Sequence, residues 1–468
     1  MRRRGLNLAR MMMLMNNGGQ SFYVDATAGD DNADGLTAAT AWQTITKVNA
    51  ATLNPKDRVL FKRAETWTLL AGGRLVGASG VTYADYGAGA LPIIDGNGVS
   101  DCILGQEKSG ITLQNLDLRN GYDACAQFIT CNGVNVIDCN MQGAGNDNLI
   151  FITNNQNVLI RGGTYHDPVR RVAGTMVTNI ELADGGSTFL IDDVECYGAE
   201  SAGITIHNHD TPTPIPTNVT VRNSDLHDNT GNGVQVLSQG ASAAPVIIID
   251  NCTLDRNDSG IRVFKSVASA YYPQGVTLKN STMADNLTYG FYFQADDCAI
   301  RRCVTSGTTQ QNRILECKRI TIYNNTIYLS PATALWPLYI MGGARVDTVT
   351  VRNNIFYMNT NSGQMVGTAA SSTTNVTFDY NWYFFKSYAG NARWQNGGST
   401  VTYANWLLAG FDAHSSPDPS GDALFTDAAN GDFTLQALSP AIDAGVVIAG
   451  VTDGYLGAAP DCGYIETA

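Results

Sequence analysis

One short pattern recurs along most of the chain and constrains its fold more than any other feature. It has the form apolar-x-apolar-x-Asn-x-x-apolar, and residues 218–226, NVTVRNSDL, are a clear copy. Val219 and Val221 alternate with polar residues, which is typical of a short strand with one buried face. The spacing of about two to three dozen residues between copies indicates a solenoid. Further copies begin at Ile111, Val136, Phe189, Val246, Val276, Ile320 and Val349.

Each unit also contains a strand that begins with Gly, as in AGITI, NGVQV, SGIRV and YGFYF. One such unit cannot bury its apolar face alone, but stacked neighbours can. β-Branched residues and recurrent Gly disfavour helices. The repeat therefore predicts an all-β, right-handed parallel β-helix with three strands in each of about 10–11 coils.

Aligning the units places an Asn at the same turn in most coils, where its side chain can bond the turn backbone and its neighbours in the stack. The aligned residues are Asn115, Asn223, Asn251, Asn280, Asn324 and Asn353, with Asp138 and Asp193 as substitutes. The repeat divides the chain into four predicted segments. These are an N-terminal tether at 1–20, a cap and first coil at 21–100, the β-helix at 101–385 and a closing segment at 386–468.

The two ends of the chain resemble a large family of bacterial and phage right-handed β-helix proteins described as pectate-lyase-like. The stretches YVDATAGDDNADG, AWQTITKVNA and DRVLFKRAETW match its opening, and SPAIDAG with DCGYIE matches its closing block. The resemblance implies a first strand and a capping helix at the N-terminal end. It also implies a polysaccharide partner on a bacterial surface or outside the cell, and a virion-tail or extracellular location. A homotrimer fits a tail spike, although coiled-coil heptads are not seen.

The composition narrows the function classes. With a net charge of −13, broad binding to nucleic acid is disfavoured because that needs a basic face. An anionic glycan stays compatible if a local basic patch or a bound cation reverses the field. The apolar run Met11–Met15 is too short to cross a membrane and predicts a tether, with a degenerate signal peptide as the alternative. The ten Cys predict small core fillers rather than a disulfide framework.

A run of acidic residues near the N-terminus has two interpretations. Asp25, Asp30, Asp31, Asn32 and Asp34 could bind Ca²⁺, but their spacing misses the EF-hand loop. A turn built from Asp, Asn and Gly is the favoured interpretation. Ca²⁺ therefore stays a candidate cofactor without an assigned site.

The Gly-led strands carry unusual outward residues, so their sheet is the predicted site. Outward side chains on neighbouring coils lie about 4.8 Å apart and form a groove matched to a polymer. Four of the five His fall between residues 166 and 227, and imidazole suits proton transfer near neutral pH. The predicted catalytic residues are His207, Arg262, Lys265, Tyr292 and Glu181. The predicted substrate-binding residues are His209, Arg170, Arg171, Gln235, Gln294, Tyr289 and Asp258.

The stretch RVFKS is similar to a part of alginate and dermatan lyases of the β-helix type. In those enzymes a Lys in this turn acts as the base and an Arg one coil later assists. Lys265 matches that Lys, whereas Gln294 stands at the position of the Arg. An uncharged amide cannot stabilise a substrate carboxylate as a guanidinium does.

Three functions remain open from the sequence. The first is a lyase that cleaves an acidic glycan by β-elimination, with His207 as base, Arg262 and Lys265 neutralising charge, and Tyr292 donating a proton. The second is a glycoside hydrolase with a carboxylate pair drawn from Glu181, Glu200, Asp228 and Asp258. The third is a spike that binds glycan without cleaving it, in which the polar residues simply cover a solvated sheet.

Overall fold

Short parallel strands, each followed by a turn, make up most of the described chain, as the repeat predicts. The computed structural model describes residues 18–467. The gaps are 172–174, 210–212, 239–244, 268, 308, 310, 331–335, 343–344, 359–363, 370–373, 386–392 and 419–421. Within the described residues the strands form a right-handed parallel β-helix of about 11 turns, which confirms the predicted fold. The chain divides into two units, residues 1–165 with 169–175, and residues 166–168 with 176–468.

The first unit has three sheets of parallel strands and a helical cap. One sheet runs β1 (Ser21–Val24), β2 (Arg58–Lys62), β5 (Thr82–Tyr86), β8 (Thr112–Gln114), β11 (Asn135–Ile137) and β14 (Gln156–Arg161). The second runs β4 (Leu75–Val76), β7 (Ile103–Gln106), β10 (Ala124–Ile129) and β13 (Asp147–Ile152). The third runs β3 (Thr66–Thr68), β6 (Ile93–Asp95), β9 (Asp117–Arg119) and β12 (Asn140–Gln142). The strand β15 (Thr164–His166) lies where the chain leaves this unit.

The cap of the first unit contains η1 (Ala38–Thr40) and the predicted helix, α2 (Ile45–Ala50). The Thr44 side chain caps α2 by accepting the Lys47 N–H at 3.1 Å. The acidic run forms turns, because Asp31 accepts the backbone N–H groups of Gln43 and Thr44 at 2.8 and 3.0 Å. Asp25 likewise accepts from its own turn and pairs with a Lys of β2. These contacts favour the turn interpretation of the run.

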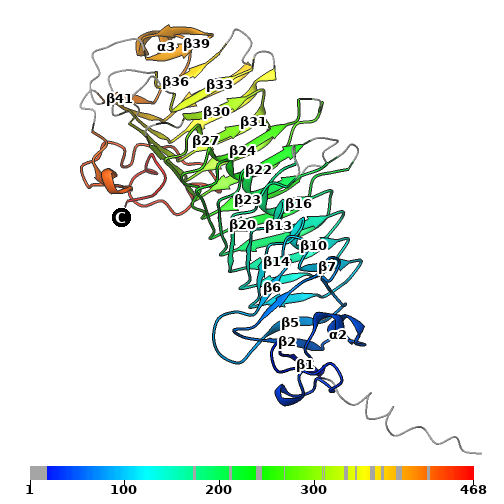
Figure 1. Cartoon of the computed structure of the whole chain (residues 1–468). Helices are drawn as coiled ribbons and strands as arrows, with labels where there is room; N and C mark the ends of the chain where they lie inside the picture. Colours follow the sequence, from blue (N-terminus) through cyan, green and yellow to red (C-terminus); the bar gives the residue numbers. More distant parts are fainter. Residues whose placement is uncertain are drawn as a thin grey trace, which may run out of the picture. The chain divides into compact units, whose positions relative to one another are not determined.

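The second unit carries the strands that lead with Gly, stacked one above another in Figure 1. We call this sheet the Gly-led sheet. It runs β16 (Thr178–Ala183), β19 (Ala202–His207), β22 (Asn232–Ser238), β24 (Ser259–Lys265), β27 (Tyr289–Phe293), β30 (Gln311–Leu315), β33 (Leu338–Met341), β36 (Val366–Thr368) and β39 (Trp394–Asn396), with antiparallel β40 (Ser399–Val401) at the edge.

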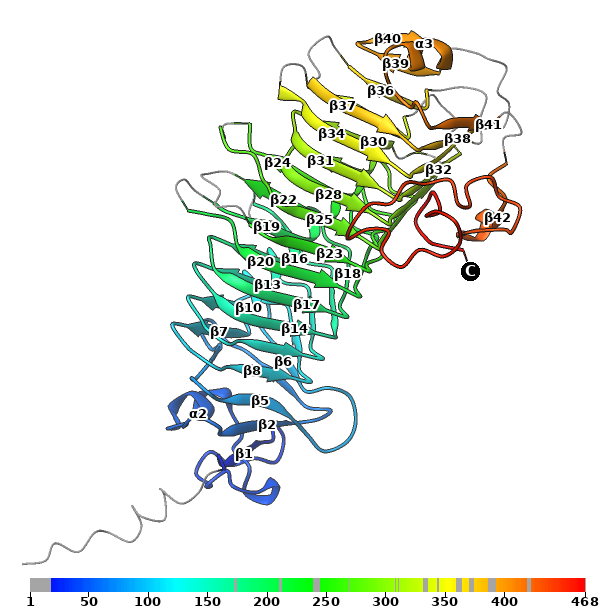
Figure 2. The same cartoon turned by 180° about the vertical axis from the view of Figure 1, so that it is seen from behind.

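Two further faces complete the coils of the second unit, and Figure 2 shows the longer one. That sheet runs β17 (Ser187–Asp192), β20 (Thr217–Arg222), β23 (Ile247–Asp250), β25 (Val276–Lys279), β28 (Asp296–Arg301), β31 (Lys318–Tyr323), β34 (Asp347–Arg352) and β37 (Thr374–Asp379). The third face has β18 (Glu195–Tyr197) paired with β21 (Asp225–His227), and a sheet of β26 (Thr282–Ala284), β29 (Val304–Gly307), β32 (Thr326–Leu329), β35 (Ile355–Met358), β38 (Trp382–Phe385) and β41 (Ser416–Asp418).

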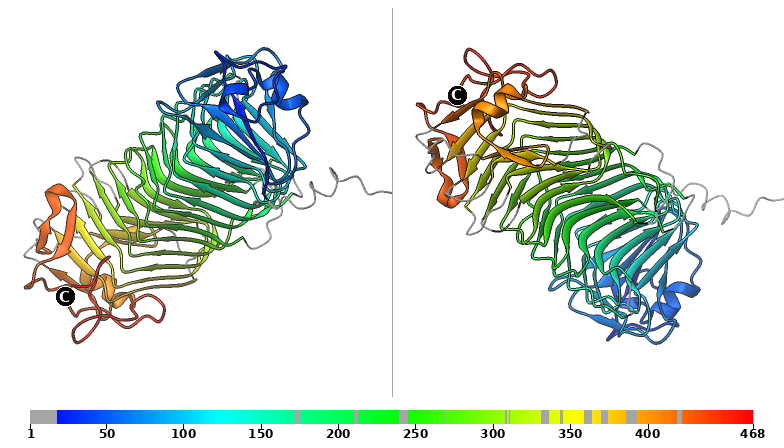
Figure 3. Two further views of the ribbon diagram at one scale, coloured as in Figure 1. Left: turned by 90° about the horizontal axis from the view of Figure 1, so that it is seen from below. Right: turned by 90° about the horizontal axis from the view of Figure 1, so that it is seen from above.

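The closing segment packs against the last coils of the second unit, and Figure 3 shows it in orange and red. It contains α3 (Tyr403–Leu408), η3 (Ala428–Asn430) and the hairpin β42 (Phe425–Asp427) with β43 (Asp432–Leu435). Buried Asp412 accepts the Tyr383 hydroxyl and the Trp406 indole N–H, both at 2.7 Å. This carboxylate therefore ties the segment to β38. No described helix is long and apolar enough to span a membrane.

The cores confirm the inward positions expected from the repeat. Val219, Val221 and Leu226 are fully buried, and so are their equivalents in neighbouring coils. All ten Cys are buried and free of disulfides, as predicted. The predicted turn residues, from Asn115 to Asn353, all have φ between 51 and 60°. Asn tolerates this left-handed conformation better than most residues, which explains its recurrence.

A second row of Asn, at Asn229, Asn257 and Asn286, lies inside the coils and is buried. The Asn257 side-chain oxygen accepts the backbone and side-chain N–H groups of Asn229 at 3.0 and 2.9 Å. Its amide donates to the Leu226 carbonyl at 2.9 Å. These amides satisfy turn backbone groups that would otherwise be buried without partners.

We expect Asn257→Ala to lower the free energy of unfolding by about 2–4 kcal/mol, because each stranded buried polar group costs about 1–3 kcal/mol. Chemical denaturation followed by circular dichroism measures the loss. The matched control is Asn251→Gly, which keeps an allowed positive φ and removes one exposed hydrogen bond to Asn223. Equal midpoints for the two variants would contradict the role given to the buried row.

Candidate functional site

Consecutive strands of the Gly-led sheet align four of the predicted site residues, Glu181, Gln235, Arg262 and Tyr292, in one row. The register pairs Glu181 with Thr205, Thr205 with Gln235, and Gln235 with Arg262. It then pairs Arg262 with Tyr292. The row continues through Arg313 and Tyr339, which the sequence reasoning missed. We call this row the outward ladder.

Aromatic rings hold the two arginines of the outward ladder in place. The Arg262 guanidinium lies 4.6 Å from the centre of the Phe264 ring and 5.2 Å from that of Tyr292. Arg313 lies 5.2 Å from the centre of the Tyr289 ring. An aromatic ring attracts a nearby guanidinium cation, so these contacts stabilise the two Arg side chains and fix their positions. Burial raises the pKa of the Tyr292 phenol, while the nearby Arg262 charge opposes the rise.

No carboxylate among the described residues neutralises the charge of Arg262 or Arg313. Within the described residues, the Nε atom of each is buried and makes no hydrogen bond, and neither side chain forms an ion pair. This is unusual in a protein of net charge −13. The two guanidinium groups lie in one row with Tyr292 between them, and they give this row a local positive charge.

A cluster of His and carboxylates lies at the β16 end of the outward ladder. The His207 Nε2 is 2.9 Å from Glu181 Oε1, and the His209 Nε2 is 3.6 Å from the same oxygen. The side chains of Glu181 and His207 are only 4% and 0% exposed, whereas that of His209 is 46% exposed. The Asp184 carboxylate holds His209 through Nδ1 at 2.8 Å. The exposed member is thus His209, whereas His207, predicted from the sequence to be an outward catalytic residue, is buried.

Lys265, the last residue of β24, and Gln294, which directly follows β27, belong to a separate group at the C-terminal ends of these strands. The Lys265 ammonium donates to the Ser269 carbonyl at 2.9 Å and lies 5.4 Å from the centre of the Tyr272 ring. Gln294 donates to Glu316 at 2.8 Å, and Tyr272 donates to the same carboxylate at 2.9 Å. These bonds hold the pKa of Glu316 below its usual range, with the Gln294 bond contributing most.

Other predicted binding residues make structural contacts. Gln235 is buried and accepts from Asn232 at 2.9 Å. Asp258 accepts the Thr288 hydroxyl at 2.6 Å and so fixes a turn. Arg170 and Arg171 lie in the first unit, where Arg170 donates to the Thr175 carbonyl. Arg171 lies over the Tyr122 ring and donates to the Gly98 carbonyl at 2.7 Å.

The His cluster seen in the sequence separates into two groups in space. His207 and His209 lie at the Gly-led sheet, whereas His166 and His227 stack on either side of Tyr197 at 4.8 and 5.4 Å. That second stack lies along the β18–β21 face. Sequence distance did not show which face of the coil each His would occupy.

The carboxylates considered for hydrolysis are also scattered. Asp228 forms a bidentate pair with Arg256, at 2.9 and 2.8 Å. The Arg256 bond, with help from His227, lowers the pKa of Asp228 to about 2. Asp228 therefore stays ionised on the β21 side and is unsuited to act as a general acid.

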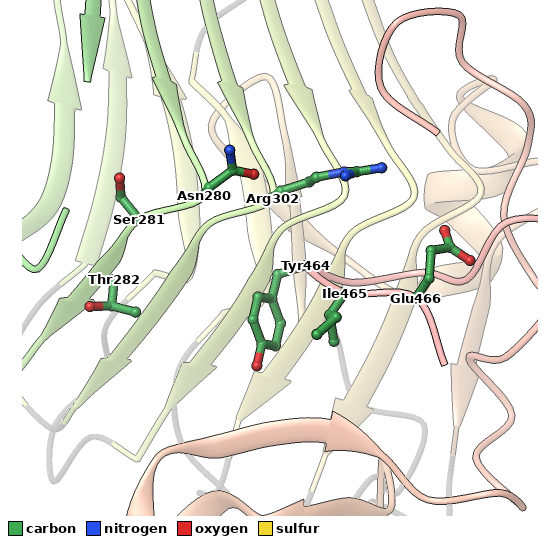
Figure 4. Close-up of a pocket in the computed structure, with 7 residues that line it drawn as sticks. All are labelled: Asn280, Ser281, Thr282, Arg302, Tyr464, Ile465 and Glu466. Carbon is green, nitrogen blue, oxygen red and sulfur yellow. The ribbon is translucent and has the colours of Figure 1, made fainter. Parts of the chain in front are cut away.

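A pocket of about 380 Å³ lies on a different face of the second unit and is drawn in Figure 4. C-terminal residues Tyr464, Ile465 and Glu466 form one wall, and Asn280 to Thr282 with Arg302 form the other. Burial raises the pKa of the Glu466 carboxyl. The pocket contributes no residue to the outward ladder, so we regard it as a packing gap beneath the closing segment.

Comparisons with known proteins agree with the fold. A family model described as a right-handed β-helix region matches residues 101–272. The A-module of mannuronan C-5 epimerase AlgE6 from Azotobacter vinelandii is 12% identical, with a TM-score of 0.51 over 77% of this chain and 91% of that one. Pectate lyase Pel9A is 17% identical over 97% of both chains, with a TM-score of 0.44. A search of curated protein sequences finds no match.

A GH136 lacto-N-biosidase from Eubacterium ramulus is another structural neighbour, 13% identical over 78% of this chain and 69% of that one, with a TM-score of 0.44. The family model and the epimerase module, whose TM-score exceeds 0.5, support the fold, and identities below 25% say nothing about the reaction. The resemblance to pectate-lyase-like β-helix proteins, expected from the sequence, is confirmed in this sense.

The raised pKa of His227, on the β18–β21 face, predicts how the stability of the protein changes with pH. Burial opposes charging of His227, but its bond to Asp228 and the nearby Asp225 and Glu195 carboxylates outweigh that effect and raise its pKa above the ordinary value of 6.5. Stability from the charged His227 is thus complete below pH 6.5 and is lost as the pH rises through the higher, folded-state pKa.

We therefore expect His227→Phe, which keeps a ring in the stack, to destabilise the protein more at about pH 5.5 than at about pH 8.5. The difference is less than about 1 kcal/mol, because solvent screens these partly exposed pairs. Denaturation midpoints across the pH series measure it, and NMR titration of His227 gives the pKa directly. A midpoint difference that does not change with pH would refute the assignment.

Proposed function

We propose that the protein cleaves an acidic polysaccharide, bound along the outward ladder, by β-elimination. The observation that carries the proposal is a pair of guanidinium groups, Arg262 and Arg313, that make no ion pair with any described residue and are held by aromatic rings on either side of Tyr292 along the row. Guanidinium groups bind carboxylates in a bidentate manner, and the rings offer apolar faces to sugars. A mannuronan C-5 epimerase shares this fold, which agrees with the proposal without carrying it.

The outward ladder suits a polymer because its side chains repeat along the coil axis. Arg262 and Arg313 lie two strands apart, which is about 9.6 Å along the sheet. A linear glycan laid on this row can present carboxylates of successive sugars to both guanidinium groups. The local positive charge also offsets the repulsion that an acidic substrate would otherwise meet from a protein of net charge −13.

Elimination requires three groups. One neutralises the uronate carboxylate, so that the proton on the adjacent carbon becomes acidic, and Arg262 fills that role. A base removes the proton as the C–O bond to the next sugar breaks and a C=C bond forms. A proton donor then protonates the departing oxygen, and the Tyr292 phenol beside Arg262 is suited to this.

The proton acceptor comes from the cluster of Glu181, His207 and His209. His207 was the base expected from the sequence, but it is fully buried and His209 is the member that a substrate can reach. The strand of His207 and the strand of Arg262 lie two strands apart, since Thr205 pairs with Gln235 and Gln235 with Arg262, and His207 is two residues further along β19 than Thr205. The two strands are about 9.6 Å apart, and the two-residue offset adds about 6.6 Å along the strand, which leaves room for a sugar between the side chains.

The test is incubation of the full chain with alginate, pectate and acidic bacterial capsules. We expect the absorbance of an unsaturated uronate to rise together with reducing ends. Arg262→Gln and Arg313→Gln should each lower kcat/KM by about 10²-fold or more, as expected when a charge-stabilising group is lost. The control is Arg222→Gln on β20, whose guanidinium pairs with Asp192 away from the row.

Three other outcomes would each contradict a specific part of the proposal. Reducing ends without absorbance would indicate hydrolysis and would contradict elimination. An equal loss in the Arg222 variant would show a general effect on folding and would contradict the site. Binding to the glycans without any cleavage would contradict an enzyme and favour a binding spike.

A further inference from the structure

The cluster of Glu181, His207 and His209 contains metal-ligating side chains whose atoms converge. The two imidazole Nε2 atoms lie 2.9 and 3.6 Å from one carboxylate oxygen, Glu181 Oε1. One ligand atom from each residue lies within 4.8 Å of the other two. Among the described residues, this is the one group of three or more His, Cys, Asp or Glu that meets this condition.

The spacing is close to that of a bound zinc ion. Zinc sits about 2.0–2.1 Å from an imidazole nitrogen and about 2.0–2.2 Å from a carboxylate oxygen, so neighbouring ligand atoms of a tetrahedral site are about 3.3–3.5 Å apart. The two contacts to Glu181 Oε1, 2.9 and 3.6 Å, fall on either side of that separation. An ion would require shifts of only a few tenths of an ångström in these two contacts, and the exposed His209 can make the larger adjustment.

Asp184 orients His209 as metal-binding histidines are oriented. Its Oδ1 accepts the His209 backbone N–H at 2.7 Å, and its Oδ2 lies 2.8 Å from Nδ1. With Nδ1 donating to Asp184, Nε2 presents its lone pair toward Glu181. That 3.6 Å contact is longer than a hydrogen bond, so two electron-pair donors face each other across a gap that a cation would fill.

The burial of the cluster agrees with a cation between these groups. Glu181 and His207 are buried, and buried charged groups in proteins are usually paired or coordinate a metal. His209 is half-exposed, so an ion can enter from solvent. Three protein ligands would leave one coordination position open, as in catalytic zinc sites.

His414 makes the same contacts to an Asp as His209 does, but among the described residues it has no Glu or second His beside it, so it serves as a comparison for the cluster. His414 is held by Asp379 just as His209 is held by Asp184, with its backbone N–H at 2.8 Å and its Nδ1 at 2.9 Å. However, the His414 ring stacks on Tyr380 at 4.7 Å. The Asp–His pair therefore occurs with and without converging ligands, and Glu181 with His207 makes the difference.

We propose that Glu181, His207 and His209 bind one divalent transition-metal ion of the zinc type, with Asp184 positioning His209. The donor set selects the ion: two imidazoles and one carboxylate suit Zn²⁺ and its neighbours, whereas Ca²⁺ takes six to eight oxygen ligands. The Ca²⁺ considered from the sequence is thus not the ion that these residues favour. Three protein ligands leave a coordination position that water or a substrate oxygen can take.

The test is calorimetric titration of the metal-stripped full chain with ZnCl₂. We expect one equivalent to bind with a dissociation constant in the micromolar range or tighter. His209→Ala should weaken binding at least tenfold, and Asp184→Asn should weaken it by about 10–100-fold, as loss of an orienting carboxylate does. Because His209 is exposed, the His209 variant should fold normally, which circular dichroism and the unfolding midpoint check.

Co²⁺ serves as a second probe that does not depend on catalysis. In the wild-type chain Co²⁺ should give the visible absorption bands of a four-coordinate site, and His209→Ala should abolish them. His414→Ala is the matched control and should leave both titrations unchanged. CaCl₂ in place of ZnCl₂ should give no saturable binding at this site.

Three results would overturn the proposal. These are no Zn²⁺ binding to the stripped chain, equal binding by wild type and the His209 variant, or equal losses in the His209 and His414 variants, which would show adventitious surface binding. Metal binding does not depend on the proposed glycan cleavage, and an ion bound to His209 Nε2 would occupy the lone pair with which His209 accepts a proton in that proposal. A chain that cleaves glycan through Arg262 but binds no Zn²⁺ refutes only the metal site, and the reverse result refutes only the cleavage.

Discussion

Parallel backbone hydrogen bonds between successive coils are the constraint on which the rest of the structure depends. They fix the register so that Val219 packs on Ile247, and Ile247 on Val276, along one inward row. A slip of one residue would turn each strand's apolar side chains outward, because side chains alternate between the two faces. Burial in the core therefore enforces the register, and the register places every outward side chain directly beside its counterpart one coil away.

This division between inward and outward positions explains why the fold could be predicted from the sequence. Inward positions must stay apolar in every coil, and the turn at Asn223 must adopt a left-handed conformation in every coil. Both requirements recur at a fixed place in each unit, so they are visible without a structure. The buried row from Asn229 to Asn286 was partly visible too, as Asn at an equivalent loop position.

The site was less predictable because outward residues repeat no pattern. Assigning the Gly-led strands to one sheet did find Glu181, Gln235, Arg262 and Tyr292 in a single row. Arg313 was missed because its strand, QNRIL, lacks the leading Gly, although extending the row by one coil would have found it.

The histidines show a second limit of the sequence. His207 and His227 are 20 residues apart, yet they belong to different faces, because a coil turns twice between them. Loop lengths decide that outcome, and they vary from coil to coil. Burial was equally hidden, since the same strand pattern fits an exposed His207 and the fully buried one observed.

The two Asp–His pairs of the chain show how much chemistry depends on the neighbouring coil. In each pair one carboxylate binds the backbone N–H and the Nδ1 of a His that lies further along the chain. For His414 the nearest ring is Tyr380, and the pair fastens the closing segment. For His209 the neighbouring strand β16 supplies Glu181, and His207 comes from the end of β19, which His209 follows. Because the register alone decides which side chains meet, a structural element that occurs twice can carry reactive chemistry in only one of its two places.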